Sequence, residues 1–169
     1  MTRTKDMTIM SLMLEQFKRH MRVTGNELDA ELMQKLLAAT SSAEHHIGKV
    51  IIPSEFEVTY IIKEAAVVLR APVIGVESVE LDGVNLDADR YMLRGQVLSV
   101  PGALAGQALS VRYRAGYSEI PDDMMAAVMM HAAYMFNNPV DTVQSLPKAS
   151  DALLSPYRSW EVIDDGQQA

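Results

Sequence analysis

Residues 109–121 read LSVRYRAGYSEIP, and this stretch contains the change from strand to helix that organises the chain. Apolar and polar residues alternate from Leu109 to Ala115, which is the pattern of a half-buried β-strand. Gly116 ends the strand, and Pro121 is a residue type favoured in the first turn of a helix. The stretch therefore predicts a strand that leads into a helix.

Further strands are predicted on the N-terminal side of this stretch. Several segments alternate or are rich in aromatic and β-branched side chains, and they lie at 55–62, 67–70, 76–81, 90–93 and 96–100. Tight turns are predicted at Asp82-Gly83 and Arg94-Gly95, because glycine readily adopts positive φ angles. Together these segments predict a small antiparallel sheet of hairpins over about residues 54–116.

Two helices are predicted before the strands. Apolar residues recur every three or four positions over 11–21, with Lys18 and Arg19 facing away from the apolar side. The same spacing continues over 27–47, and Gly48 is suited to end that helix.

Two more helices are predicted after Pro121, the first ending before Asn137 and the second, a short one, over 147–155. The order of elements predicts an α+β protein, mainly a helical bundle with an inserted small antiparallel β-hairpin sheet. We expect one domain over residues 1–160, with helices at about 11–47 and 121–155 and strands at about 54–116. Residues 161–169 are expected to be a disordered acidic tail.

Composition excludes several classes of protein. The 169 residues are 49% hydrophobic and 22% charged, which is typical of a folded globular chain. The absence of cysteine excludes disulfides, thiolate metal sites and cysteine nucleophiles. The net charge of −7 is unfavourable for gripping nucleic acid, which needs clustered Lys and Arg. No apolar run approaches the roughly 20 residues of a membrane span, so we expect a protein that stays in the cytoplasm where it is made.

No spacing in the sequence predicts a catalytic, cofactor or metal site. His45 and His46 are adjacent on a predicted helix, where their side chains point about 100° apart and cannot share one metal ion. His20 and His131 stand alone. The acidic residues around Asp82 lack the spacing of a calcium-binding loop, which favours a solvated hairpin. We therefore expect no enzyme activity, no cofactor and no metal.

Two groups of residues are candidates for an interface. Arg112 and Arg114 share one face of their strand while Tyr113 takes the other, so the arginines either form a solvated face or bind a neighbouring subunit. The second group lies near the C-terminus and consists of Leu153, Leu154, Tyr157, Arg158 and Trp160. Its helix is too short to be stable alone, so the two leucines must pack on the chain's own core or on a partner.

Methionine is abundant, with 12 in the chain. Most methionines lie at positions where helical spacing predicts core. Because methionine adapts to irregular packing, they either fill gaps in that core or form an exposed subunit interface.

The order of elements, with its short motifs, resembles the head–tail connector (head-completion adaptor) proteins of long-tailed bacteriophages and prophages. The resemblance covers about residues 9–160. The motifs that carry it are LEQFKRHMRV (14–23), LRAPVIGVESV (69–79), LSVRYRAGY (109–117) with the helix after Pro121, and ALLSPYR (152–158).

The resemblance implies a structural virion protein and no catalyst. Such a protein forms a ring, twelve-fold in the virion, under the portal protein, extends the DNA channel, and gives the stopper or tail-completion protein an attachment site. It implies a location in the virion neck after assembly in the host bacterial cytoplasm, DNA that passes without specific binding, and no membrane. It also supports, loosely, docking of residues 148–160 on the portal.

Two other functions stay open from the sequence. One is another neck or tail-completion protein of the same virion. The other, from a different class, is a small cytoplasmic ligand-binding domain or enzyme whose site forms only in three dimensions.

Overall fold

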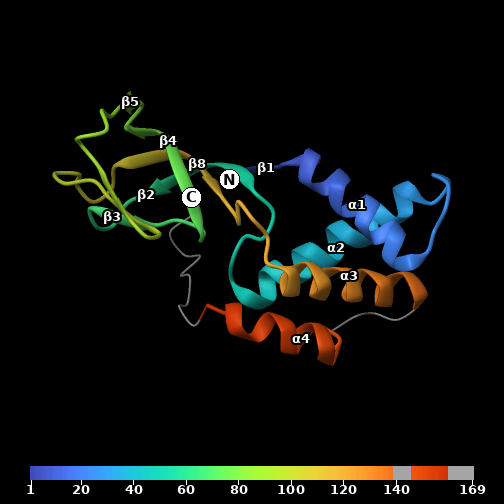
Figure 1. The fold of residues 1–169 in the computed structure, drawn as a ribbon. Coiled ribbons are helices and arrows are strands. Elements are labelled where there is room, and N and C mark those ends of the chain that lie inside the picture. The colour runs from blue at the N-terminus through green and yellow to red at the C-terminus, as the bar shows by residue number, and fades with distance from the viewer. Residues whose placement is uncertain (139–145, 160–169) are drawn as a thin grey trace. The chain divides into compact units, whose positions relative to one another are not determined.

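The computed structural model describes residues 1–138 and 146–159 (Figure 1). The chain divides into two compact units. The first, here called the β unit, contains residues 1–5 and 53–118, and the second, the helical unit, contains residues 6–52 and the described residues from 119 onward. The single domain predicted from the sequence stays a prediction, and each unit is described by itself.

The β unit is built around a five-stranded antiparallel sheet in the order β1-β2-β8-β4-β5. Its strands are β1 (Thr2–Lys5), β2 (Ser54–Ile61), β8 (Ala108–Ala115), β4 (Val73–Leu81) and β5 (Val84–Asn85). The structure confirms the strands predicted at 55–62, 76–81 and 109–115. Strand β8 lies between β2 and β4, so the stretch that ends in Gly116 is the centre of this sheet.

Three short strands form a second sheet in the order β3-β7-β6. They are β3 (Ala66–Val68), β7 (Val97–Ser99) and β6 (Met92–Arg94). The hairpin predicted at Arg94-Gly95 is confirmed, and Gly95 has a φ of 60°. The sequence predicts one sheet where the structure has two, because alternation marks a strand without identifying its partner.

Strand β1 is not predicted by the sequence. It pairs with β2 in the register Arg3↔Phe56, and the Arg3 guanidinium lies 5.3 Å from the centre of the Phe56 ring. Arg3 Nε also donates a hydrogen bond to Ser54 Oγ at 3.1 Å. All four residues of β1 are polar, so no apolar alternation marks this strand.

The core of the β unit is centred on two stacked rings. Phe56 of β2 and Tyr113 of β8 have centroids 5.2 Å apart and planes inclined by 16°. The Tyr113 hydroxyl accepts a hydrogen bond from the backbone N–H of Arg70 at 3.3 Å, and burial raises the pKa of this phenol. Every second residue of β2 is buried, as the sequence pattern predicts for a strand with one solvated face.

The helical unit contains α1 (Met7–Met21), α2 (Asp29–Ile47), α3 (Asp122–Asn137), α4 (Lys148–Leu154) and the 3₁₀ turn Ser155–Tyr157. Helix α1 begins before the predicted residue 11 because the Asp6 carboxylate accepts hydrogen bonds from the N–H groups of Thr8 and Ile9 at 3.0 and 3.4 Å. Helix α2 ends at Gly48, which has a φ of 69°, as predicted.

Lys18 is buried, whereas the sequence places it on the outer face of its helix. Only 7% of this residue is exposed. Its ammonium nitrogen lies 2.7 Å from Asp29 Oδ1 and donates to Asn26 Oδ1 at 2.8 Å. The start of α2 therefore supplies a carboxylate for a buried lysine of α1, which helical periodicity alone does not reveal.

The balance of helix and strand corrects the predicted fold class. Helices and antiparallel sheets are both present, but the prediction of a mainly helical bundle is wrong. Helix covers 39% and strand 26% of the part of the chain that the structure describes. The difference arises because the central strands are eight or nine residues long and α4 has only seven residues.

Glu44 forms hydrogen bonds with the segment that follows α2. It is 8% exposed, and its Oε1 accepts hydrogen bonds from the N–H groups of Ile51 and Ile52 at 2.8 and 3.2 Å. One carboxylate thus binds two successive backbone donors of a buried segment.

Replacing Glu44 tests this contact. We expect Glu44→Ala to lower the free energy of unfolding by about 2–3 kcal/mol, because two buried N–H groups lose this acceptor. Glu44→Gln keeps an acceptor oxygen and is expected to lose less. Urea denaturation of both variants and the wild type measures the difference. Equal losses for both substitutions would contradict the role of the oxygen acceptor.

His131 is a buried titratable residue of the helical unit. It lies in α3, is fully buried, and neither ring nitrogen has a hydrogen-bond partner among the described residues. Burial lowers the pKa of His131 from its ordinary value of 6.5, so the folded state keeps the neutral ring. The unfolded chain binds the proton first as pH falls.

We therefore expect the contribution of His131 to the free energy of unfolding to be fully present above pH 6.5. This contribution is expected to decrease as pH falls through 6.5 toward the lower pKa of His131 in the folded state. His131→Leu removes this component and is expected to flatten the dependence. Urea denaturation between pH 5 and 8, with the exposed His45→Ala as control, measures it. An unchanged dependence in the leucine variant would disprove the assignment to His131.

Candidate interaction sites

The histidines lie in different settings. His45 is exposed, whereas His46 Nε2 lies 2.9 Å from Asp151 Oδ1 of α4. Within residues 1–138 and 146–159, no three His, Cys, Asp or Glu side chains are grouped so that they could hold a metal ion. No described helix is long and apolar enough to cross a membrane. The predicted absence of a metal, a cofactor and an enzyme activity stays a prediction.

The two arginines of β8 lie on the exposed face of the five-stranded sheet. Arg112 is directly opposite Glu57 of β2, with Nη2 and Oε1 3.4 Å apart, and both side chains are more than half exposed. Arg114 is directly opposite Glu55 in the register of β8 against β2, and Tyr113 points to the core. The predicted division of faces is confirmed. Binding of a neighbouring subunit by these arginines stays a prediction.

Asp82 organises one end of the sheet. Asp82 and Gly83 have φ angles of 50° and 78°, as the predicted tight turn requires. The Asp82 carboxylate accepts hydrogen bonds from the Ala108 N–H at 2.9 Å and from Gln107 Nε2 at 2.8 Å. This aspartate therefore joins the β4–β5 turn to the start of β8.

The loop from Pro101 to Gly106, here called the apolar loop, lies beside this junction. Its sequence is PGALAG, and all its side chains are apolar or absent. Leu104 is 70% exposed, although its backbone N–H donates to Gln107 Oε1 at 2.7 Å. The loop thus presents a large apolar side chain from a hydrogen-bonded backbone.

The C-terminal candidate residues divide between core and surface. Leu154 is fully buried in the helical unit, Leu153 and Tyr157 are half-buried, and Arg158 is exposed. The Ser159 N–H donates to the Ile47 carbonyl at 2.7 Å. Burial and then the neighbouring Asp123 raise the pKa of the Tyr157 phenol. Leu154 is therefore not part of the surface of this unit, and Trp160 lies outside the described residues. Docking on a portal stays a prediction.

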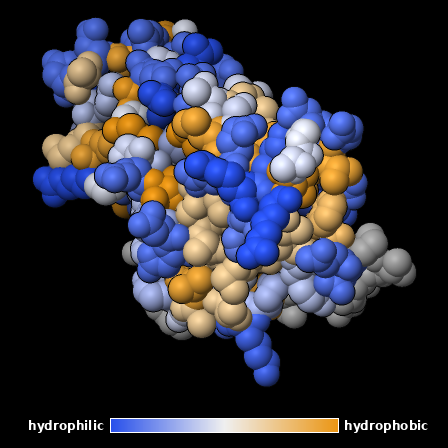
Figure 2. Space-filling view, turned by 45° about the vertical axis from the view of Figure 1, so that its right-hand side comes forward, coloured by the Kyte–Doolittle hydropathy of each residue, from blue (hydrophilic) through white to orange (hydrophobic). Residues whose placement is uncertain are grey.

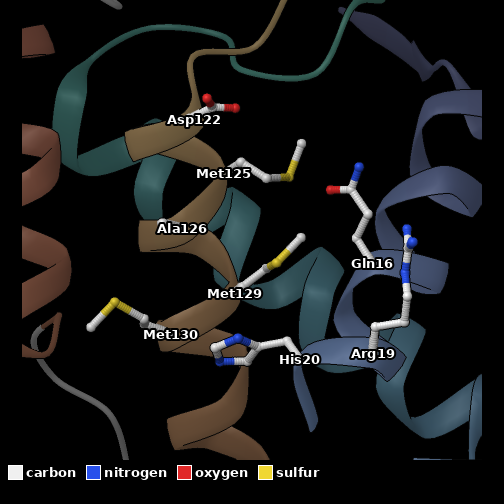
Figure 3. A pocket seen from close by; sticks show the side chains of 8 residues that line it. All are labelled: Gln16, Arg19, His20, Asp122, Met125, Ala126, Met129 and Met130. Carbon is white, nitrogen blue, oxygen red and sulfur yellow. The ribbon is translucent and has the colours of Figure 1, made fainter. Parts of the chain in front are cut away.

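A cleft of about 460 Å³ lies between α1 and α3 (Figure 3). Helix α1 lines it with Gln16, Arg19 and His20. Helix α3 contributes Asp122, Ala126 and three methionines, Met125, Met129 and Met130. Met125 and Met129 extend from α3 toward α1, and His20 extends toward α3 (Figure 3). This cleft, here called the methionine cleft, has an apolar floor and polar residues at its rim.

Only part of this cleft could be predicted from the sequence. Met124 and Val128 form the core side of α3 and are fully buried, while Met125 and Met130 are only half-buried. The signal is the pair Met125 and Met129, spaced four residues apart beside the core stripe. Recognising it requires knowing which helix faces α3, and periodicity does not give that.

Apolar side chains also reach other parts of the surface. Figure 2 shows them in several separate places among hydrophilic ones on the face that it presents. Single exposed apolar residues are common in soluble proteins. A continuous loop or a cleft is therefore a better candidate for binding than any one of these positions.

No protein-family model matches the sequence, and no curated protein matches it. Solved structures do match. One is the "Neck of empty GTA particle computed with C6 symmetry", with a TM-score of 0.77, 23% identity, and coverage of 97% of this chain and 98% of that chain. A second is the "Neck of native GTA particle computed with C12 symmetry", with a TM-score of 0.76, 22% identity, and coverage of 97% and 98%.

A third match is the "Virion of native gene transfer agent (GTA) particle", with a TM-score of 0.71, 22% identity, and coverage of 89% of this chain and 91% of that chain. The chain therefore has the fold of a component of the neck of gene transfer agent particles. At this level of identity the comparison defines the fold, and the function is argued separately.

Leu154 and Leu153 form a matched pair for testing the C-terminal segment. We expect Leu154→Ala to lower the free energy of unfolding by about 2–5 kcal/mol, because it leaves a cavity in the core. The half-buried Leu153→Ala is expected to cost less. Thermal and urea unfolding followed by circular dichroism measure both. Similar small losses would show that α4 contributes little to this core and would favour docking elsewhere.

Proposed function

We propose that this chain is a structural neck protein of a tailed-phage-like particle, and more narrowly a ring-forming head–tail connector. In this role it docks under the portal protein, extends the DNA channel, and gives the stopper or tail an attachment site. The observation that carries the proposal is the similarity of fold to neck components over nearly the full length of both chains. The sequence motifs at 69–79 and 109–117 support the same role independently.

Assembly into a ring is part of the proposal. The two neck structures were computed with six-fold and twelve-fold symmetry. A subunit of such a ring repeats one contact around an axis, and twelve copies are the number that the resemblance to connectors implies.

The charge of the chain agrees with a channel that DNA passes through. The net charge is −7 and the isoelectric point is about 5.0. DNA is repelled by a surface of the same sign, and firm phosphate binding needs clustered basic residues. A wall of such subunits is therefore suited to surround DNA without holding it.

Deleting the gene in the strain that makes the particles tests this function. We expect DNA-filled heads that lack tails, because the portal then has no connector to which a tail can attach. Electron microscopy of purified particles measures this, and expression of the wild-type chain from a plasmid should restore tails. Normal tailed particles after deletion would refute the proposed function.

A further inference from the structure

A ring of identical subunits that contact one another head to tail needs two different surfaces on each copy. One surface of each subunit binds the complementary surface of the next, and the contact closes into a ring when the rotation is suitable. The inference below rests on the proposed function and identifies these two surfaces. The described part of the chain carries a protruding apolar feature and a concave apolar feature, in different units.

The protruding feature is the apolar loop. Its residues Pro101 to Gly106 carry no polar side chain, and five of the six are exposed. Surface loops are usually polar, because a run of exposed apolar residues lowers solubility. A run of this kind on a surface loop therefore indicates a function. Leu104, at 70% exposure, is the most exposed of the large hydrophobic residues in the described chain.

The apolar loop is also held in a fixed shape. The Ala103 N–H donates to the Val100 carbonyl at 3.1 Å, and the Gly106 N–H donates to the Ile62 carbonyl at 2.8 Å. The side chain of Gln107 connects the Leu104 N–H to the Asp82 carboxylate, with distances of 2.7 and 2.8 Å. A preorganised loop loses little conformational entropy on binding.

The concave feature is the methionine cleft. Its floor of Met125 and Met129 can adapt to an aliphatic side chain, since methionine is unbranched and polarisable. Gln16 and Arg19 at the rim carry N–H donors suited to the backbone carbonyls of a loop. Because the apolar loop has no charged side chain, its insertion brings no unpaired charge into the cleft. An apolar centre with a polar rim is the usual arrangement of a protein interface.

We propose that the apolar loop of one copy inserts Leu104 into the methionine cleft of the next copy in the ring. The occupant of the cleft is thus a second copy of this chain. A contact of this kind is heterologous, so each copy uses its loop toward one neighbour and its cleft toward the other.

The absence of cysteine from the chain allows a direct test. Leu104→Cys and Met125→Cys are prepared as separate single-cysteine proteins, mixed at a concentration where the wild type self-associates, and oxidised. We expect a disulfide-linked pair in the mixture on a non-reducing gel and little linkage in either variant alone. Leu104→Cys mixed with Ala38→Cys, an exposed position on α2 outside the cleft, is the matched control and should not link above background.

The outcomes separate the inference from the proposed function. If the wild type associates in sedimentation velocity but the mixture links no better than the control, the inference is wrong and the ring stands. If Leu104→Cys links efficiently to itself, the contact is symmetric and the inference is also wrong. If the wild type does not associate at any attainable concentration and does not bind its portal, the ring fails and the inference fails with it. Circular dichroism of each variant verifies that it is folded.

Discussion

The stacking of Tyr113 on Phe56 is the contact on which the β unit depends. It sets the register of β8 against β2, where Phe56 is directly opposite Tyr113. A slip of one residue would bring Arg112 and Arg114 into the core and expose Tyr113, because successive side chains of a strand point to opposite faces. Strand β8 also pairs with β4, and β1 pairs with the other edge of β2 opposite Phe56, so this register extends across the sheet.

Features that depend on neighbours along the chain could be predicted from the sequence. The β8 strand, the Gly48 helix end and the Asp82-Gly83 turn follow from alternation and from backbone conformations that particular residues adopt. Features that depend on distant partners could not. The all-polar β1 forms a strand only because β2 offers it an edge, and Lys18 is buried only because Asp29 meets it. The methionine cleft belongs to the same class, since it exists only where α1 faces α3.

Some charged side chains among the described residues form pairs within their own units. The ion pairs that show this are Arg112–Glu57 and Lys18–Asp29. The exposed pair Arg112–Glu57 contributes little to stability and is screened by salt. A contact between copies made by Leu104 and methionines gains instead from removing apolar surface from water. The proposed ring contact therefore should depend only weakly on ionic strength, in contrast to one based on the arginines of β8.

A single inserted loop is a small contact, and the ring explains how it suffices. One side chain and its flanking residues bury much less area than a stable interface between two isolated proteins requires, so a pair of free copies should dissociate readily. In a closed ring every copy is held by two such contacts. Once most copies are in place, the last contact forms within one assembly at a high effective concentration. A portal that binds several copies side by side raises the effective concentration in the same way. Weak pairwise contacts between the apolar loop and the methionine cleft are thus compatible with soluble free subunits and a stable ring, because cooperation between contacts supplies the stability that no single contact has.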